Sequence, residues 1–448
     1  MTEASSYRGW MPPDVAAFVA QHDARYAALP LAALDEMLFA LVDAHEQHLD
    51  TTCINLYAGT NIPNPRSARL LGSTIGSRPN LGYPGDKYNK GMQHADQIEV
   101  LLTHLLRRAF GAKYVEHRVG SGSLANLYAY MATTRPGDPI LAFGDAAAGH
   151  PTHHAVGAAG LYGLQVHEVP FDSDRMDIDL DGLARVAHDI RPKLIIVAGS
   201  MCLFPYNVAG ARAVADDVGA YLLYDAAHMG GLIAGGQFQQ PLAEGAHLMT
   251  GSTYKSFGGP PGGMVLTDDA ELAARLDRIA FPGLTANFDL ARSAALALAA
   301  LDSLTYGQPY AVQCIANAQA LAAALADHGV AVHHVAGRGH TASQHVAVRA
   351  TAYDGGNAAC KRLEAAHLLM TGIGLPGEAV AGEYNAIRIG TQEVTRWGMR
   401  ETEMAQIAML IARVLVGDEP PAQVRPDTIA LRSGFQKVQF VRVEPGHE

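Results

Sequence analysis

The chain has 448 residues, of which 49% are apolar and 17% charged, a composition typical of a folded globular protein rather than a disordered one. Its formal net charge of −11 argues against nucleic acid as the main partner, because phosphate binding needs a concentrated positive surface. Four scattered cysteines predict neither disulfides nor a zinc site and fit a cytoplasmic protein. Neither a signal peptide nor a membrane span is predicted from the apolar pattern.

The predicted elements fall into three parts. Residues 1–50 are expected to form an N-terminal arm with helices, residues 51–300 a large domain, and residues 301–448 a small C-terminal domain. The segment 51–91 is rich in Gly, Pro, Asn and Tyr and carries no helix or strand pattern. A segment of this length without regular structure inside a compact chain is usually functional.

From residue 97 onward, helical patterns alternate with short apolar runs, which lie at 139–143, 193–198, 221–225, 247–250 and 264–267. This alternation predicts an α/β fold with a mostly parallel sheet covered by helices on both faces. The strand pair around Lys255 breaks the alternation, so we expect one antiparallel strand.

The C-terminal part has a different pattern. Residues 289–328 predict long Ala/Leu-rich helices that link domains or build a subunit interface. Strand patterns at 330–335, 345–350 and 386–390, mixed with helical ones, then predict a smaller α+β domain.

Polar side chains follow the predicted strands at the edge where open α/β sheets bind ligands, namely Ser200, Asp225, His228 and Lys255. Lys255 has small neighbours and a glycine-rich turn after it. A buried lysine loses its proton more easily and becomes a nucleophile, as expected of a lysine that holds pyridoxal phosphate (PLP) as a Schiff base. Taken alone, the loop fits a surface lysine better.

Three further features each have a functional and a structural interpretation. The Gly-Ser-Gly-Ser sequence at 120–123 is expected to begin a helix. It fits either a phosphate-binding turn or an ordinary helix cap. Asp225 is placed to hold a pyridine nitrogen protonated, or to cap the next turn. Arg388, on an apolar strand, suits bidentate capture of a carboxylate or lies at an exposed edge.

Three histidines, His150, His153 and His154, lie close together in a small-residue stretch. They lack carboxylates or cysteines at ligand spacing, so no metal site is predicted. Roles as a base or as a stacking group near a cofactor are more consistent with this pattern.

Together these motifs resemble the serine hydroxymethyltransferase family of fold-type I PLP enzymes. The similarity runs from about residue 50 to 415. It rests on G-Y-P-G-D-K-Y at 82–88, S-G-S-L-A-N at 121–126, G-H-P-T-H at 149–153, Y-D-A-A-H-M-G-G-L at 224–232, T-Y-K-S-F-G-G-P-P-G-G at 253–263, F-P-G at 281–283 and I-R-I-G-T at 387–391. The resemblance implies a mostly parallel seven-stranded sheet flanked by helices, a smaller C-terminal α+β domain, and a homodimer or tetramer with sites shared between subunits.

The resemblance also implies a set of site residues. Those expected to be catalytic are Lys255, His228, Tyr88 and His150. Those expected to bind PLP are Ser121, Gly122, Ser123, Asp225, His228, Ser200, Ser252 and Lys255. Those expected to bind the substrate are Arg388, Tyr83 and Tyr88, with Tyr88 supplied by a neighbouring subunit.

Departures from the family pattern bear on the reaction. Leu81 stands where the folate-using enzymes carry a glutamate that acts as the acid–base group of hydroxymethyl transfer. A leucine cannot move a proton, so tetrahydrofolate is not expected as an efficient acceptor. The family's ring-stacking histidine falls in a segment that is one residue shorter here, so either Ala148 replaces it or His150 moves into its place.

The resulting prediction is a PLP-dependent aldolase or transaldolase that works without folate. It would interconvert a β-hydroxy-α-amino acid, such as serine, threonine or α-methylserine, with glycine or alanine. The alternatives are a tetrahydrofolate-dependent serine hydroxymethyltransferase, a PLP aminotransferase or racemase, and a non-enzymatic protein of this fold.

Overall fold

The computed structural model describes residues 10–443, which belong to two compact units, Met1–Cys53 and Ile54–Glu448. In the first unit, prolines near the start of α1 and before α2 open the two helices, since proline fits the first helical turn but not the interior. The elements of this unit are α1(Pro13–Ala27), α2(Leu31–Gln47) and the π-helical turn η2(His48–Thr52). The three-part division of the chain stays a prediction.

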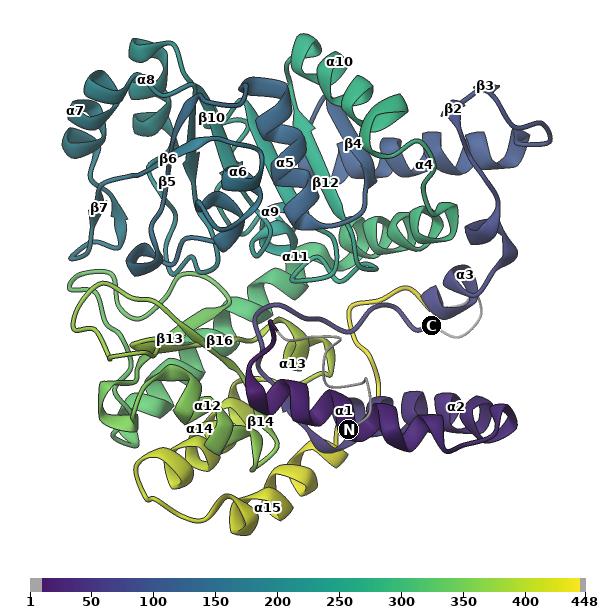
Figure 1. Ribbon diagram of the computed structural model, residues 1–448. Helices are drawn as coiled ribbons and strands as arrows, with labels where there is room; N and C mark the ends of the chain where they lie inside the picture. The colour runs from purple at the N-terminus through teal and green to yellow at the C-terminus, as the bar shows by residue number, and fades with distance from the viewer. Residues whose placement is uncertain (1–9, 444–448) are drawn as a thin grey trace. The chain divides into compact units, whose positions relative to one another are not determined.

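The larger sheet of the second unit has seven strands (Figure 1). Their order is β4(Tyr114–Val119), β12(Gly263–Thr267), β11(Leu248–Ser252), β10(Tyr221–Asp225), β9(Leu194–Val197), β5(Pro139–Ala142) and β6(Gln165–Glu168). β12 runs antiparallel to both of its neighbours, and the remaining pairs are parallel. The predicted fold class is therefore confirmed, including its one antiparallel strand.

Each face of this sheet packs against its own helices. One face meets α5(Gly122–Thr133) and α10(Ala270–Arg278); the other meets α4(Gln93–Phe110), α7(Leu180–Ile190), α8(Val208–Val218) and part of α11(Leu290–Asp327). On β9, Leu194 and Ile196 join the first core, whereas Ile195 and Val197 join the second. Because successive side chains point to opposite faces and both faces are buried, the strand reads as a continuous apolar run.

A smaller antiparallel sheet lies in the C-terminal part (Figure 1), in the order β13(His345–Arg349), β16(Ala386–Gly390) and β15(Thr371–Ile373). It shares a core with α12(Gly356–Glu364) and α14(Glu401–Leu415), and α15(Pro421–Ser433) follows. The region predicted as several long helices is the single helix α11, which contributes Leu296 to Cys314 to the core of the larger sheet and Ala318 to Leu325 to that of the smaller.

Two assignments made from the sequence are wrong. Residues 330–335 form no strand but only isolated bridges, because the chain turns back between Val335 and Gly339. Tyr114–Val119, where no strand was predicted, forms the edge strand β4. Its polar run hides the strand pattern, and Arg118 is nevertheless buried because it pairs with Glu116 at 2.6 Å.

The segment 51–91 also has more regular structure than predicted. It contains β1(Ile54–Asn55), α3(Ser67–Leu71), the 3₁₀ helix Thr74–Ser77, and the hairpin of β2(Gly82–Tyr83) and β3(Asp86–Lys87). β1 pairs in parallel with β14(Leu368–Leu369), far along the chain. Within residues 10–443, no helix combines the length and the apolar character needed to cross a membrane.

Candidate active site

Five of the predicted site residues line one cavity of about 200 Å³, namely His150, Ser200, His228, Lys255 and Arg388. They come from the segments that follow β5, β9, β10 and β11 and from the central strand of the smaller sheet. The carboxyl ends of neighbouring parallel strands meet at one edge, which explains why residues so distant in sequence converge.

Lys255 is buried at the base of this cavity. Its Nζ lies 3.0 Å from Nε2 of His228, whose Nδ1–H donates to the carbonyl of Ala58 at 3.1 Å. That donation leaves Nε2 of His228 as an acceptor. Burial lowers the pKa of Lys255 to about 8, and the charge of Arg388 adds to the effect while Asp225 opposes it. The lysine is thus a ready nucleophile near neutral pH.

Asp225 is also buried and is held by three donors. Its Oδ2 lies 2.8 Å from Nε2 of His153 and accepts from Nδ2 of Asn126 at 3.1 Å, and its Oδ1 accepts from the amide of Ala227. Burial alone would raise the pKa of this carboxyl, but His153 and the other donors hold it below its ordinary value. Asp225 therefore stays anionic and offers a fixed negative charge.

Arg388 projects from β16 toward the cavity. One guanidinium nitrogen, Nη1, donates to the carbonyl of Ser200 at 2.6 Å, and Nη2 donates to Oγ1 of Thr371 at 3.2 Å. Its Nε is buried and has no hydrogen-bond partner within the described part of the chain. A fixed guanidinium with an unused donor can bind a carboxylate.

The start of α5 lies against the end of β11. Ser121 caps the helix by accepting from the amide of Leu124 at 3.1 Å. A Cβ on Gly122 would stand 2.3 Å from Oγ of Ser252, so only glycine permits this approach. Ser121, Gly122 and Ser123 thereby lie beside Ser252, and the first amides of a helix have no intrahelical acceptor.

His150, and not Ala148, lines the cavity. Its Nδ1 accepts from the amide of Thr152 at 3.2 Å, so the proton of the neutral ring lies on Nε2. Burial lowers the pKa of His150 to about 4, against the attraction of Asp225. His150 therefore presents an N–H donor and a ring face, a better fit to a stacking role than to a base.

The cavity lining does not include Ser121, Gly122, Ser123, Asp225 or Ser252. It does not include Tyr83 or Tyr88 either. These two tyrosines belong to the β2–β3 hairpin and its end, where Tyr88 is 83% exposed and Tyr83 is 45% exposed with its ring 6.0 Å from that of Phe281. Leu81 lies at the start of the same hairpin. A single chain does not bring these side chains to Lys255.

Several site residues were not predicted from the sequence. Tyr57, Thr371 and Tyr384 line the cavity, and no local motif marks them. Asn126 and His153 lie inside motifs that were recognised, but their contact with Asp225 was not foreseen. Only the fold brings their positions together.

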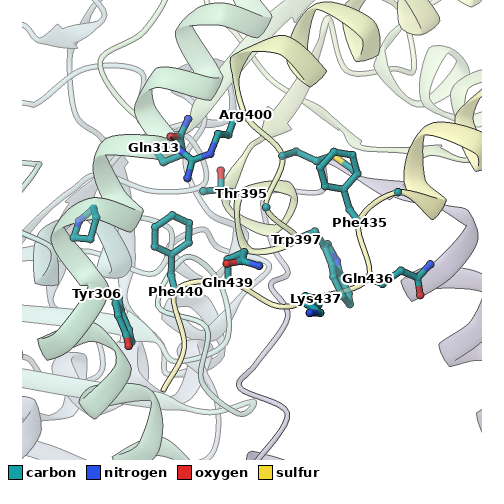
Figure 2. Close-up of a pocket in the computed structure, with 14 residues that line it drawn as sticks. Tyr306, Gln313, Thr395, Trp397, Arg400, Phe435, Gln436, Lys437, Gln439 and Phe440 are labelled. Carbon is teal, nitrogen blue, oxygen red and sulfur yellow. Dashed lines mark hydrogen bonds between the residues drawn. The ribbon is translucent and has the colours of Figure 1, made fainter. Parts of the chain in front are cut away.

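A larger cavity of about 700 Å³ lies elsewhere in the second unit, between α11 and residues 434–440 (Figure 2). Its lining includes Gln313, Trp397, Arg400 and Phe440, but none of the predicted site residues. The chemistry-bearing side chains are in the smaller cavity, which we take as the active site.

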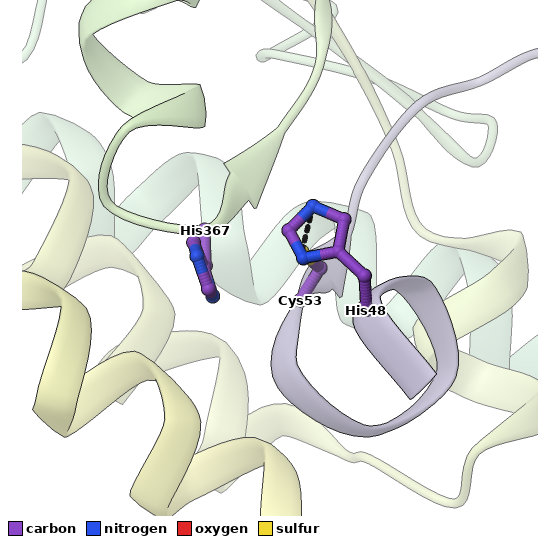
Figure 3. A group of neighbouring side chains, drawn as sticks. All are labelled: His48, Cys53 and His367. Carbon is purple, nitrogen blue, oxygen red and sulfur yellow. Dashed lines mark hydrogen bonds between the residues drawn. The ribbon is translucent and has the colours of Figure 1, made fainter. Parts of the chain in front are cut away.

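In the first unit, the thiol of Cys53 lies 3.5 Å from Nε2 of His48, within hydrogen-bond distance for sulfur (Figure 3). The backbone amide of Cys53 also donates to the carbonyl of His48 at 3.1 Å. These contacts close the π-helical turn that ends the unit.

The mostly parallel sheet, with a buried lysine and arginine in one cavity and a buried aspartate whose charge acts on that lysine, defines an α/β enzyme with a lysine-centred site. The protein-family model for serine hydroxymethyltransferase matches residues 31–411. The chain belongs to the serine hydroxymethyltransferase family, as the sequence motifs predicted.

Individual relatives refine this result. An α-methylserine aldolase from Ralstonia sp is 45% identical over 97% of this chain and 99% of its own. A serine hydroxymethyltransferase from Methanopyrus kandleri is 40% identical over 90% of this chain and 96% of its own. The crystal structure of an L-threonine transaldolase from Pseudomonas fluorescens, in its internal aldimine state, is similar with a TM-score of 0.81 and 25% identity over 94% of both chains.

Proposed function

We propose that this protein is a PLP-dependent α-methylserine aldolase, which cleaves α-methylserine to alanine and formaldehyde without tetrahydrofolate. The observation that carries the proposal is the 45% identity to an enzyme of that name over nearly the whole of both chains. Leu81, at the position of the family's acid–base glutamate, supports the independence from folate.

The residues present fit PLP. Lys255 offers a buried amine, and Asp225 offers a permanent anion for the pyridine nitrogen. The cradle that requires Gly122 offers helix amides and hydroxyl groups for the phosphate, from Ser121, Gly122, Ser123 and Ser252. When bound, PLP would supply an electron sink for the charge that develops on Cα. Ser200 and His150 would flank its ring.

In the cleavage, the β-hydroxyl loses its proton, the Cα–Cβ bond breaks as the aldehyde forms, and Cα takes up a proton to give alanine. Arg388 would hold the substrate carboxylate. His228 is neutral, because burial and the charges of Lys255 and Arg388 lower its pKa well below the ordinary value. His228 keeps the Lys255 amine in place, and that amine, with a pKa of about 8, would accept the proton of the β-hydroxyl and deliver it to Cα.

We further infer a homodimer or a tetramer of dimers in which Tyr88, and Tyr83 beside it, reach the cavity of a neighbouring subunit. The high exposure of Tyr88 in one chain supports this arrangement.

The test is incubation of the purified holoenzyme with α-methylserine, with and without tetrahydrofolate, followed by assays of formaldehyde and alanine. We expect equal amounts of both products in both reactions. Product formation only with tetrahydrofolate would favour the hydroxymethyltransferase activity in the name of the Methanopyrus kandleri relative instead. Pyruvate in place of alanine would indicate transamination.

A further inference from the structure

Tyr57 lies in the wall of the cavity and has no role in the mechanism described above. It shares the cavity lining with Lys255 and Arg388. The Cζ atom of Arg388 lies 5.7 Å from the centroid of the Tyr57 ring. Burial lowers the pKa of Arg388, and the interaction with the Tyr57 phenol acts in the opposite direction. The phenol and the guanidinium therefore share one polar region, in which Nε of Arg388 has an unused hydrogen.

Gly59 makes room for this tyrosine. A Cβ added to Gly59 would stand 2.5 Å from Cζ and 2.6 Å from Oη of Tyr57, closer than side-chain atoms approach one another. The phenol hydroxyl thus occupies the space that the side chain of residue 59 would take.

The backbone that carries Tyr57 is fixed from several sides. Its amide donates to Oδ1 of Asn55 at 3.1 Å, and its carbonyl accepts from Nε2 of Gln392 at 2.9 Å. The next carbonyl, that of Ala58, accepts from His228. Because its backbone is fixed and its ring lies against Gly59, the Tyr57 side chain is positioned before the substrate arrives, which reduces the entropy lost on binding.

We propose that the Tyr57 hydroxyl donates a hydrogen bond to the substrate carboxylate that Arg388 holds, so that the two residues together select amino acids over plain amines. The inference rests on the proposed function in that it assumes an amino-acid substrate. An arginine supplies charge and two parallel donors, and a phenol adds a third donor from another direction. Tyr384, the other tyrosine of the cavity, is 42% exposed, whereas Tyr57 is half-buried.

The test uses Tyr57→Phe holoenzyme and two ligands that differ only at the carboxylate. These are L-alanine and 2-aminopropane, in which a methyl group replaces the carboxylate. Their dissociation constants are measured from the change in the visible absorbance of the bound PLP. Loss of a hydrogen bond to a charged group should weaken alanine binding roughly tenfold to a hundredfold. The binding of 2-aminopropane should change less than about twofold.

Gly59→Ala provides an independent variant, because the added methyl must displace the ring while the phenol itself is retained. It should weaken alanine binding in the same selective way. Tyr162→Phe, at a partly buried tyrosine outside the cavity, is the matched control and should change neither constant.

Unchanged alanine binding in Tyr57→Phe would overturn the proposal. Equal weakening of both ligands, or loss of the bound PLP, would also overturn it, since Tyr57 would then act on the amine or on the cofactor. The binding assay is independent of cleavage. If the wild type binds alanine selectively but releases no formaldehyde from α-methylserine, the proposed function fails and the role of Tyr57 stands.

Discussion

In and around the cavity, burial and neighbouring charges set the charge of each functional side chain. His228 is held neutral by burial and by its two basic neighbours, so the positive charge of Arg388 remains available for a carboxylate. Lys255 loses its proton more readily than an ordinary lysine, because burial lowers its pKa to about 8 and the charge of Arg388 adds to this effect. Asp225, which is buried outside the cavity lining, keeps its negative charge because His153 lowers its pKa against the effect of burial, and Asn126 donates a hydrogen bond to it. Burial therefore determines the protonation states of Lys255, Asp225 and Arg388 as much as the residue type does.

The lowered pKa of Lys255 predicts how the apoenzyme takes up PLP. Only the neutral amine reacts, so the uptake rate should rise with pH and level off above about 8, whereas an ordinary lysine with a pKa of 10.5 would show no plateau there. Below the pKa the rate should fall about tenfold per pH unit. The measurement is the growth of the visible PLP absorbance in the apoprotein between about pH 6 and 10.

Lys255→Ala should show no such absorbance at any pH, and Lys361→Ala, at an exposed lysine on α12, should behave as the wild type. A rate that continues to rise beyond pH 9 would contradict the burial that the structure assigns to Lys255.

At the scale of elements, the β2–β3 hairpin is joined to α4 by a buried ion pair. Nζ of Lys87 lies 2.6 Å from Oε1 of Glu99, with side-chain exposures of 2% and 3%. Lys87 also donates to the carbonyl of Gly82, and Glu99 accepts from Nδ2 of Asn80. Within residues 10–443, the hydrogen-bond partners of the two side chains lie in the hairpin segment or in α4, so the pair determines where the hairpin, and with it Tyr83 and Tyr88, projects.

Removing one partner of the Lys87–Glu99 ion pair should therefore lower the stability of the protein. Lys87→Met leaves a buried carboxylate without its counter-charge and should lower the free energy of unfolding by about 3 to 5 kcal/mol, whereas the double variant with Glu99→Leu should recover most of the loss. Urea unfolding measures both. Glu271→Ala, which removes an exposed pair with Arg275 at 3.6 Å, is the control and should cost less than about 1 kcal/mol. Equal losses in the single and double variants would contradict the assigned coupling.

Sequence reasoning succeeded for elements whose pattern is local. The buried strands β9 and β10 appear as unbroken apolar runs, and the order of strands and helices then implied the parallel sheet. It failed for β4, where buried ion pairs conceal a strand, and for Tyr57, whose place beside Arg388 depends on Gly59 and on contacts from distant segments. Such residues are set by three-dimensional packing, which no single window of sequence contains.

For the whole molecule, the separation of Tyr88 from Lys255 in one chain leads to a prediction about assembly. If the inferred dimer shares its sites, each cavity combines Lys255 of one subunit with the tyrosine of the other. Lys255→Ala and Tyr88→Phe should each reduce cleavage strongly when pure. Refolding the two variants together should restore activity, because a hybrid dimer contains one site that carries neither change. Random pairing would give about one quarter of the wild-type activity.

The control for this mixing experiment is the pair Lys255→Ala and Asp225→Asn. Asp225 ends β10, and Lys255 lies in the loop that follows the paired strand β11. Both residues therefore belong to the same site of one chain, so every site in a hybrid dimer has one defect. That mixture should stay inactive, which excludes simple stabilisation of one variant by the other. Failure of the first mixture to recover, with both variants folded and dimeric, would place Tyr88 outside the neighbouring cavity. Recovery would explain why the exposed hairpin of one chain carries residues that its own cavity does not use.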